Sequence, residues 1–207
     1  MSFPRLYALT DASATGSHVD QVCEFVRAGV GLIQIRDKQA SGRELYEMVV
    51  ASLEFTRPAG AKLIVNDRVD VALAAGADGA HVGQEDLPAD AVREILGPAA
   101  IVGVSTHSAL QASAAAVLPV DYVAFGPIFA TTTKVNPDPV VGIEGLAAIR
   151  SIVAALPLVA IGGITIENAA AVYASGADSI AVVSDLRKGS SVEARVRAYL
   201  ALSPSSD

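Results

Sequence analysis

Residues 62–86 read KLIVNDRVDVALAAGADGAHVGQED and contain two short apolar runs separated by one helical segment. The runs Leu63–Val65 and Ala80–Val82 are apolar on both faces, which is typical of strands in a buried parallel sheet. Between them, Val69–Ala75 has a helical pattern, and Gly76 stands where a helix would end. The stretch therefore predicts a strand, a helix and a second strand, with polar residues directly after each strand.

The same alternation continues along the whole chain. The predicted strands are Leu6–Leu9, Gly31–Ile35, Leu63–Val65, Ala80–Val82, Ile101–Val104, Tyr122–Phe125, Leu158–Ile161 and Ile180–Val183. The predicted helices are Val19–Ala28, Gly42–Arg57, Val69–Ala75, Ala89–Leu96, Ala109–Val117, Ile143–Ala154, Ile166–Ala174 and Ser191–Leu200. Eight such pairs predict an α/β fold, a (β/α)₈ TIM barrel.

A weak internal repeat supports the barrel. The segment Ala75–Gly79 ends one helix and enters a strand, and Ser175–Ser179 repeats it half a chain later. The rival is an open doubly wound sheet, which more often has a glycine-rich turn after its first strand, and Leu9–Ala12 is not such a turn. We therefore expect residues 1–207 to form one barrel domain, with 203–207 as a frayed tail.

Composition narrows the classes of function. Hydrophobic residues make up 52% of the chain and charged residues 18%, so a large core is expected and disorder is not. The net charge is −7 and there is no basic run, so nucleic acid is a poor partner. Apolar runs are too short to span a membrane and the N-terminus lacks a signal sequence, which indicates a cytoplasmic protein. The single cysteine, Cys23, excludes internal disulfides and is expected to be buried, while the sequence leaves homo-oligomerisation open.

Polar residues follow nearly every predicted strand. In a (β/α)₈ barrel the active site is built from the loops at the carboxyl ends of the strands, so these groups should meet at one rim. They are Gln34, Ile35, Arg36, Asp37 and Lys38 after the second strand, Asn66 and Asp67 after the third, Asp86 after the fourth, Ser105 after the fifth, Thr131–Lys134 after the sixth, Gly162 and Gly163 after the seventh, and Val183 and Ser184 after the eighth.

Two carboxylates end adjacent strands. Asp67 and Asp86 together could hold one Mg²⁺, which favours one or two carboxylates plus phosphate oxygens. Arg36, Lys38 and Lys134 would then place positive charge around the same phosphates. Helix capping and a structural ring of salt bridges use the same residue types, so the residues alone leave these interpretations open.

A second group of residues suits an anion. Phosphate sites in these barrels recur in the loops after strands seven and eight, where Gly162 and Gly163 allow close backbone approach and Ser184 adds donors. The loop Thr131–Lys134 offers three hydroxyls and an ammonium. A tight turn and a solvated surface loop are the simpler interpretations. Among the histidines, we expect His18 at the surface, His81 in the core and His107 at the rim.

The motifs together resemble the thiamine phosphate synthase family. They are Gln34-x-Arg36-x-Lys38, Asn66-Asp67-Arg68, Gly76–Asp86, Gly103-Val104-Ser105, Gly126–Phe129 with Thr131-x-Thr133-Lys134, and Ile161–Ile164. The resemblance covers almost the whole chain. It implies a (β/α)₈ barrel that uses Mg²⁺ to join a hydroxymethylpyrimidine diphosphate to a thiazole phosphate, releasing pyrophosphate and thiamine phosphate.

The resemblance also implies roles for individual residues. Asp67 and Asp86 would hold Mg²⁺. The pyrimidine diphosphate would be bound by Gln34, Ile35, Arg36, Asp37, Lys38, Asn66, Ser105 and Lys134, with Arg36, Lys38, Ser105 and Lys134 as catalytic residues. The thiazole phosphate would be bound by Thr131, Thr132, Thr133, Gly162, Gly163, Val183 and Ser184. Two positions depart from the family: Asp37 replaces a more common Glu, and Asp185 puts a carboxylate where a small residue is usual.

Two alternatives stay open. A thiazole tautomerase resembles the synthase and shares its barrel, and His107 is the residue that favours it. The diphosphate-binding groups Arg36 and Lys38 and the paired aspartates count against it, because an isomerase needs no such grip. A non-catalytic module that binds thiamine phosphate would not need a metal pair.

Overall fold

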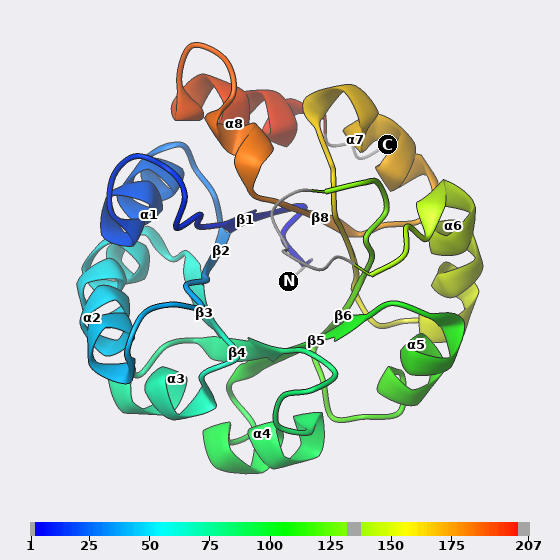
Figure 1. Cartoon of the computed structure of the whole chain (residues 1–207), viewed down its shortest axis with the longest axis horizontal. Coiled ribbons are helices and arrows are strands. Elements are labelled where there is room, and N and C mark those ends of the chain that lie inside the picture. Colours follow the sequence, from blue (N-terminus) through cyan, green and yellow to red (C-terminus); the bar gives the residue numbers. More distant parts are fainter. Residues whose placement is uncertain (1–2, 132–137, 203–207) are drawn as a thin grey trace.

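The computed structural model describes residues 3–131 and 138–202, and their eight parallel strands form a closed barrel (Figure 1). Each strand pairs with its sequence neighbours, and β8 pairs with β1 to close the ring. The strands are β1 (Leu6–Leu9), β2 (Leu32–Ile35), β3 (Lys62–Asn66), β4 (Gly79–Val82), β5 (Ile101–Thr106), β6 (Tyr122–Phe125), β7 (Leu158–Ile161) and β8 (Ser179–Val182). The predicted (β/α)₈ TIM barrel is confirmed.

Eight α-helices form the outer ring in Figure 1, one after each strand. They are α1 (His18–Arg27), α2 (Gly42–Ala59), α3 (Val69–Ala75), α4 (Ala89–Leu96), α5 (Ala109–Ala115), α6 (Gly142–Val153), α7 (Ile166–Ala174) and α8 (Val192–Ala201). A short 3₁₀ helix, η1 (Ser184–Arg187), follows β8 and was not predicted. The predicted ends of the other elements differ by at most about two residues, as is usual where helices and strands fray.

Helix ends follow from local chemistry. Ser17 and Ser41 begin α1 and α2 as capping boxes, in which the serine hydroxyl accepts from a backbone N–H three residues later. Gly76 ends α3 in the left-handed conformation, with φ 68°, where a side chain would be strained. Among the described helices, none has the length and apolar character needed to cross a membrane.

Two hydrophobic layers lie on the two faces of the barrel wall. The outer layer packs strand residues against the helices and includes Ile35 and Val65. The inner layer fills the barrel and includes Tyr7, Ile64 and Tyr122. Because successive side chains alternate between faces, strands such as β3 supply both layers, Ile64 to the inner one and Val65 to the outer one. The inner layer therefore forms a packed floor beneath the carboxyl ends of the strands.

Candidate active site

A cavity of about 860 Å³ opens at the carboxyl ends of the strands. All eight strands, or the loops that follow them, contribute to its wall. The predicted site residues on that wall are Gln34, Arg36, Lys38, Asn66, Asp67, Asp86, Ser105, Thr131, Gly162, Gly163, Val183 and Ser184. The structure therefore brings these residues together at one mouth.

Two predicted contacts face elsewhere. Ile35 is fully buried and packs in the layer between barrel and helices. Asp37 turns toward α1, where one oxygen lies 3.1 Å from Nε2 of His18 and the other accepts from the backbone N–H groups of Gln39 and Ala40. Neither side chain lines the cavity among the described residues. Thr132, Thr133 and Lys134 lie outside the described part of the chain.

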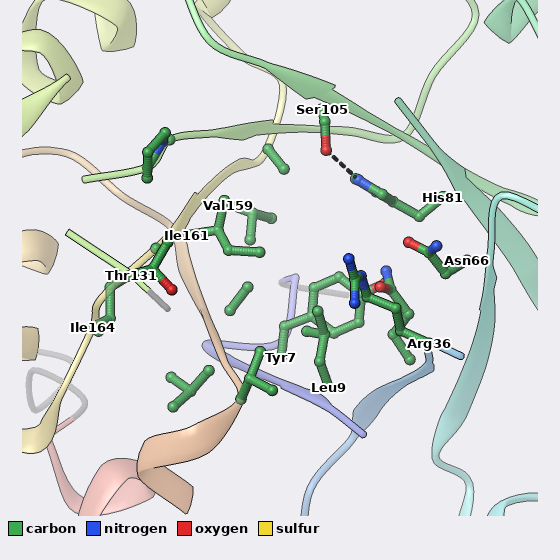
Figure 2. A pocket seen from close by; sticks show the side chains of 18 of the residues that line it. Tyr7, Leu9, Arg36, Asn66, His81, Ser105, Thr131, Val159, Ile161 and Ile164 are labelled. Atoms are coloured by element: carbon green, nitrogen blue, oxygen red, sulfur yellow. Dashed lines mark hydrogen bonds between the residues drawn. The ribbon is translucent and has the colours of Figure 1, made fainter. Parts of the chain in front are cut away.

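The cavity has two unlike sides. Figure 2 shows Arg36, Asn66 and His81 on one side, with Thr131 and Ile164 on the opposite side. The loops after β2, β3 and β4 supply Arg36, Lys38, Asp67 and Asp86 to the lining, whereas the loop after β7 supplies Gly162, Gly163 and Ile164. Asp185 and Lys188, which follow β8, also line the cavity. A ligand with a charged group at each end and a flat, less polar middle would match both sides at once.

Asp86 lies close enough to Asp67 to affect the pKa of the Asp67 carboxyl. Burial raises the pKa of Asp67 above its usual value, the charge of Asp86 raises it further, and the ammonium of Lys38, 3.1 Å away, offsets this only in part. Asp86 also accepts a hydrogen bond of 2.7 Å from the backbone N–H of Gly83. Asp67 has φ 60°, a conformation that is uncommon outside glycine and that clusters at functional sites.

These carboxylates could hold a divalent cation. Within residues 3–131 and 138–202, no group of three or more His, Cys, Asp or Glu side chains converges in a metal-binding arrangement. Two carboxylates fit a cation such as Mg²⁺ that takes its remaining oxygens from substrate and water. The pKa of Asp67 is raised first by burial and then by the charge of Asp86, and a bound cation would offset both effects.

Glycine is required on the opposite side of the cavity. Gly162 and Gly163 have φ 102° and 62°, and both lie against the segment that follows β6. A Cβ at Gly163 would overlap the carbonyl of Ala130 and the side chain of Phe129. A backbone this bare lets a ligand approach its N–H groups closely, as phosphate sites in these barrels require.

Asp185 is held in place by hydrogen bonds to one of its carboxylate oxygens. Its Oδ2 atom accepts from Tyr199 at 2.5 Å, from Nη2 of Arg195 at 2.7 Å and from the backbone N–H of Ile166 at 3.2 Å. Burial alone would raise the pKa of Asp185, but the hydrogen bonds from Tyr199 and Arg195 outweigh it and leave that pKa below its usual value. The paired carboxylate thus joins η1 to α7 and α8.

The three histidines have different outcomes. The prediction for His18 is wrong, because it is 6% exposed and bonds Thr10 at 2.7 Å. Its partners explain the burial, since both of its ring nitrogens are satisfied. His81 is buried, as predicted, and His107 lines the cavity. Cys23 is half-buried rather than buried.

Sequence reasoning missed two tyrosines. Tyr7 and Tyr122 lie inside the barrel, and their hydroxyls are 2.9 Å apart. Tyr7 accepts from Nε2 of Gln34 at 2.8 Å, and Tyr122 lies 2.8 Å from Nδ1 of His81. A phenol in an otherwise aliphatic strand is a usable signal, because its buried hydroxyl has to find a partner.

Comparison with known proteins decides the family. A family model described as thiamine monophosphate synthase matches residues 6–186. The chain belongs to the thiamine monophosphate synthase family. A thiamine-phosphate synthase from Koribacter versatilis is 46% identical over 192 residues, covering 90% of each chain. One from Azorhizobium caulinodans is 50% identical over 183 residues, covering 87% of this chain and 86% of its own.

Solved structures agree with the family assignment. A thiamine phosphate pyrophosphorylase from Pyrococcus furiosus superposes with a TM-score of 0.86 at 37% identity, covering 96% of this chain and 94% of its own. Because these relatives match nearly end to end, the family relationship extends over the whole barrel and its rim. The resemblance predicted from the motifs is thereby confirmed.

Proposed function

We propose that this chain is a transferase that makes thiamine phosphate. It joins 4-amino-2-methyl-5-(diphosphooxymethyl)pyrimidine to 4-methyl-5-(2-phosphoethyl)thiazole and releases pyrophosphate. If the thiazole is in its carboxylated form, its carboxylate leaves as CO₂ as well. The observation that carries the proposal is the two-sided cavity, in which Figure 2 shows Arg36 on one side and Ile164, the residue directly after Gly163, on the other. Family membership and the names of the relatives support the same reaction.

The reaction breaks one bond and forms another at a single carbon. The methylene–oxygen bond to pyrophosphate breaks, and its electron pair leaves with the pyrophosphate. The aminopyrimidine stabilises the positive charge left on the methylene, and the thiazole nitrogen supplies the pair for the new carbon–nitrogen bond. No covalent enzyme intermediate is needed, so binding, orientation and charge stabilisation are the tasks left to the protein.

Each side of the cavity has one of these tasks. Arg36 and Lys38 neutralise charge on the departing pyrophosphate, and Asn66 and Gln34 orient the diphosphate substrate from the same side. Asp67 and Asp86 would hold Mg²⁺, which when bound supplies electrostatic stabilisation to phosphate oxygens. Gly163, Ser184 and Thr131 anchor the thiazole phosphate, which sets the attack distance of the ring nitrogen. Lys134, Thr132 and Thr133 are part of this proposal, although they lie outside the described residues.

The experiment is a coupled product assay. Purified protein is incubated with both substrates and Mg²⁺, and pyrophosphate and thiamine phosphate are measured together. We expect the two products in equal amounts, and no pyrophosphate when the thiazole phosphate is left out. Pyrophosphate without thiamine phosphate would indicate hydrolysis, and isomerised thiazole without pyrophosphate would indicate a tautomerase. We propose a cytoplasmic setting, in keeping with one unpaired cysteine, Cys23.

A further inference from the structure

A chain of hydrogen bonds crosses the barrel interior from Gln34 to Ser105. Gln34 Nε2 donates to Tyr7 at 2.8 Å, and the hydroxyls of Tyr7 and Tyr122 are 2.9 Å apart. Tyr122 lies 2.8 Å from Nδ1 of His81, and Nε2 of His81 lies 2.8 Å from Oγ of Ser105. Figure 2 shows the last link at the edge of the cavity. Both ends of the chain are therefore residues of the candidate active site.

The middle of the chain lies behind the cavity wall. Gln34, Tyr7, His81 and Ser105 line the cavity, whereas Tyr122 is fully buried in the inner layer and is absent from the described lining. Gly103 faces Tyr122 across the β5–β6 ladder, and a Cβ there would overlap the phenol ring. Tyr122 therefore occupies space that its neighbouring strand leaves open, and a change at its hydroxyl does not remove a cavity contact.

The donors in this chain can be assigned from its first link. A phenol has one proton, so Tyr7, which accepts from Gln34, uses its own proton by donating to Tyr122. Tyr122 then donates to Nδ1 of His81. If the direction were reversed, Tyr7 would accept twice, and its proton would have no hydrogen-bonding partner among the described residues. Buried donors of this kind are costly when unpaired.

The direction of these hydrogen bonds also determines where His81 and Ser105 carry their protons. A nitrogen that accepts a hydrogen bond has no proton of its own, so an imidazole whose Nδ1 accepts from Tyr122 is neutral and has one proton. Because Nδ1 accepts from Tyr122, that proton is on Nε2 and is donated to Oγ of Ser105. The hydroxyl proton of Ser105 is then free to point into the cavity. The amide of Gln34, whose nitrogen is used by Tyr7, keeps its carbonyl oxygen as an acceptor.

We propose that Tyr7, Tyr122 and His81 are positioning residues that transmit the orientation of the Gln34 amide to the Ser105 hydroxyl. Through them, Gln34 presents an acceptor to the substrate while Ser105 presents a donor. The consequence for catalysis rests on the proposed function, because it concerns how the pyrimidine diphosphate is held. The hydrogen-bond direction does not depend on which reaction occurs.

The first test reads the tautomer of His81 directly. The wild-type chain labelled with ¹⁵N-histidine has three imidazoles, and long-range ¹H–¹⁵N spectra at pH about 7 distinguish their two neutral tautomers. His81→Asn identifies which signals are those of His81. We expect His81 to be neutral with its proton on Nε2. A proton on Nδ1, or a charged ring at this pH, would overturn the proposal whatever the enzyme does.

The second test reverses the direction of the hydrogen bonds by changing Gln34, the residue at which they begin. An ionised carboxylate can only accept, so Gln34→Glu should make Tyr7 donate to it and turn every later link around. At pH about 8.5, well above an ordinary carboxyl pKa of about 4.3, we expect His81 to move its proton to Nδ1. The double variant with Tyr122→Phe should lose this response, because the connection is cut. An unmoved tautomer in Gln34→Glu, or the same response in the double variant, would contradict the transmission.

The third test measures catalysis. Tyr122→Phe should lower kcat about tenfold, the effect of losing roughly one hydrogen bond's worth of orientation, with KM for the pyrimidine diphosphate within about threefold of wild type. It should also mix the His81 tautomers. Tyr173→Phe is the matched control, because it removes a hydroxyl that donates to the backbone of Arg5, away from the cavity. Unchanged kcat and an unmixed tautomer in Tyr122→Phe would reject the positioning role. If the wild-type protein forms no thiamine phosphate, the proposed function is wrong. The spectra would still show whether the hydrogen bonds from Gln34 to Ser105 have the proposed direction.

Discussion

Nζ of Lys38 lies 3.1 Å from Oδ2 of Asp67, yet the pKa of that carboxyl stays above its usual value. The lysine is more than half exposed, so water weakens its attraction, while burial and the nearby charge of Asp86 act the other way. One ammonium therefore does not neutralise this pair of carboxylates. A divalent cation on the same oxygens would do so.

The carboxylates should be needed for turnover. Asp67→Ala and Asp86→Ala should each lower kcat at least ~10²-fold, the scale of losing metal-assisted charge stabilisation. Thiamine phosphate formation is assayed across a range of Mg²⁺ concentrations. Calorimetric titration of Mg²⁺ in the presence of pyrophosphate gives a second readout that is independent of turnover.

Asp90→Ala is the matched control for these variants. Asp90 is an exposed carboxylate in the first turn of α4, a few residues beyond Asp86. It should leave both turnover and Mg²⁺ binding unchanged. Near-normal turnover in both Asp67→Ala and Asp86→Ala at low Mg²⁺ would reject the metal assignment.

The negative charge of Asp67 should reduce the stability of the protein when no cation is bound. The pKa of Asp67 is raised in the folded state, so folding takes up a proton between the unfolded and folded pKa values. Its contribution to stability is present below the unfolded pKa and is lost as pH rises through the folded pKa. Asp67→Asn, which keeps the shape without the charge, should therefore raise Tm at pH 7 while lowering activity.

Thermal unfolding across pH checks this prediction. The gain from Asp67→Asn should shrink as pH falls toward the ordinary carboxyl pKa of about 3.9. A gain of 1 kcal/mol corresponds to about 2–4 °C in Tm for a chain of this size. A lower Tm at pH 7 would show that the pairing with Lys38 outweighs the repulsion from Asp86.

The sequence predicted the barrel because its signals are local. Short Val- and Ile-rich strands, helical periodicity and turn glycines such as Gly76 each depend on a few neighbouring residues. Rim positions follow from the fold class, so Asp67 and Ser105 could be placed at the cavity in advance. The remainder depends on contacts between distant residues. Tyr122 forms a hydrogen bond with His81 inside the barrel. His18 can be buried because its two ring nitrogens form hydrogen bonds with Thr10 and Asp37.

Asp185 shows the same limit in one residue. Its carboxylate follows β8 in a position that suggests repulsion from a phosphate, and only the structure reveals Arg195 and Tyr199 as its partners. Removing one member of a buried ion pair costs about 3–5 kcal/mol. Asp185→Ala should therefore lower the free energy of unfolding by about that amount, measured by urea denaturation.

Two arginine variants in α8 distinguish the effect of the buried ion pair from the effect of removing one positive charge. Arg195→Met should destabilise the protein strongly, because the buried Asp185 carboxylate then keeps, among the described cations, only the exposed ammonium of Lys188, which lies 3.4 Å from Oδ1. Arg197→Met removes the exposed partner of Glu193 from the same helix, and such pairs contribute about 0–1 kcal/mol. Equal losses for Arg195→Met and Arg197→Met would show that the buried pair has no special weight.

The glycines on the second side of the cavity should act on thiazole phosphate binding. Gly163→Ala places a Cβ against Ala130 and Phe129 and forces the loop to move, so KM for the thiazole phosphate should rise more than KM for the diphosphate. Ser184→Ala should act in the same direction by removing a donor.

Gly189→Ala is the control that separates lost space from backbone strain, because Gly189 has φ 97° with no atom within 4 Å of an added Cβ. That control should lower stability by about 1–2 kcal/mol and leave both KM values unchanged. A rise confined to the diphosphate KM in Gly163→Ala would mean that the two substrates bind on opposite sides from those proposed.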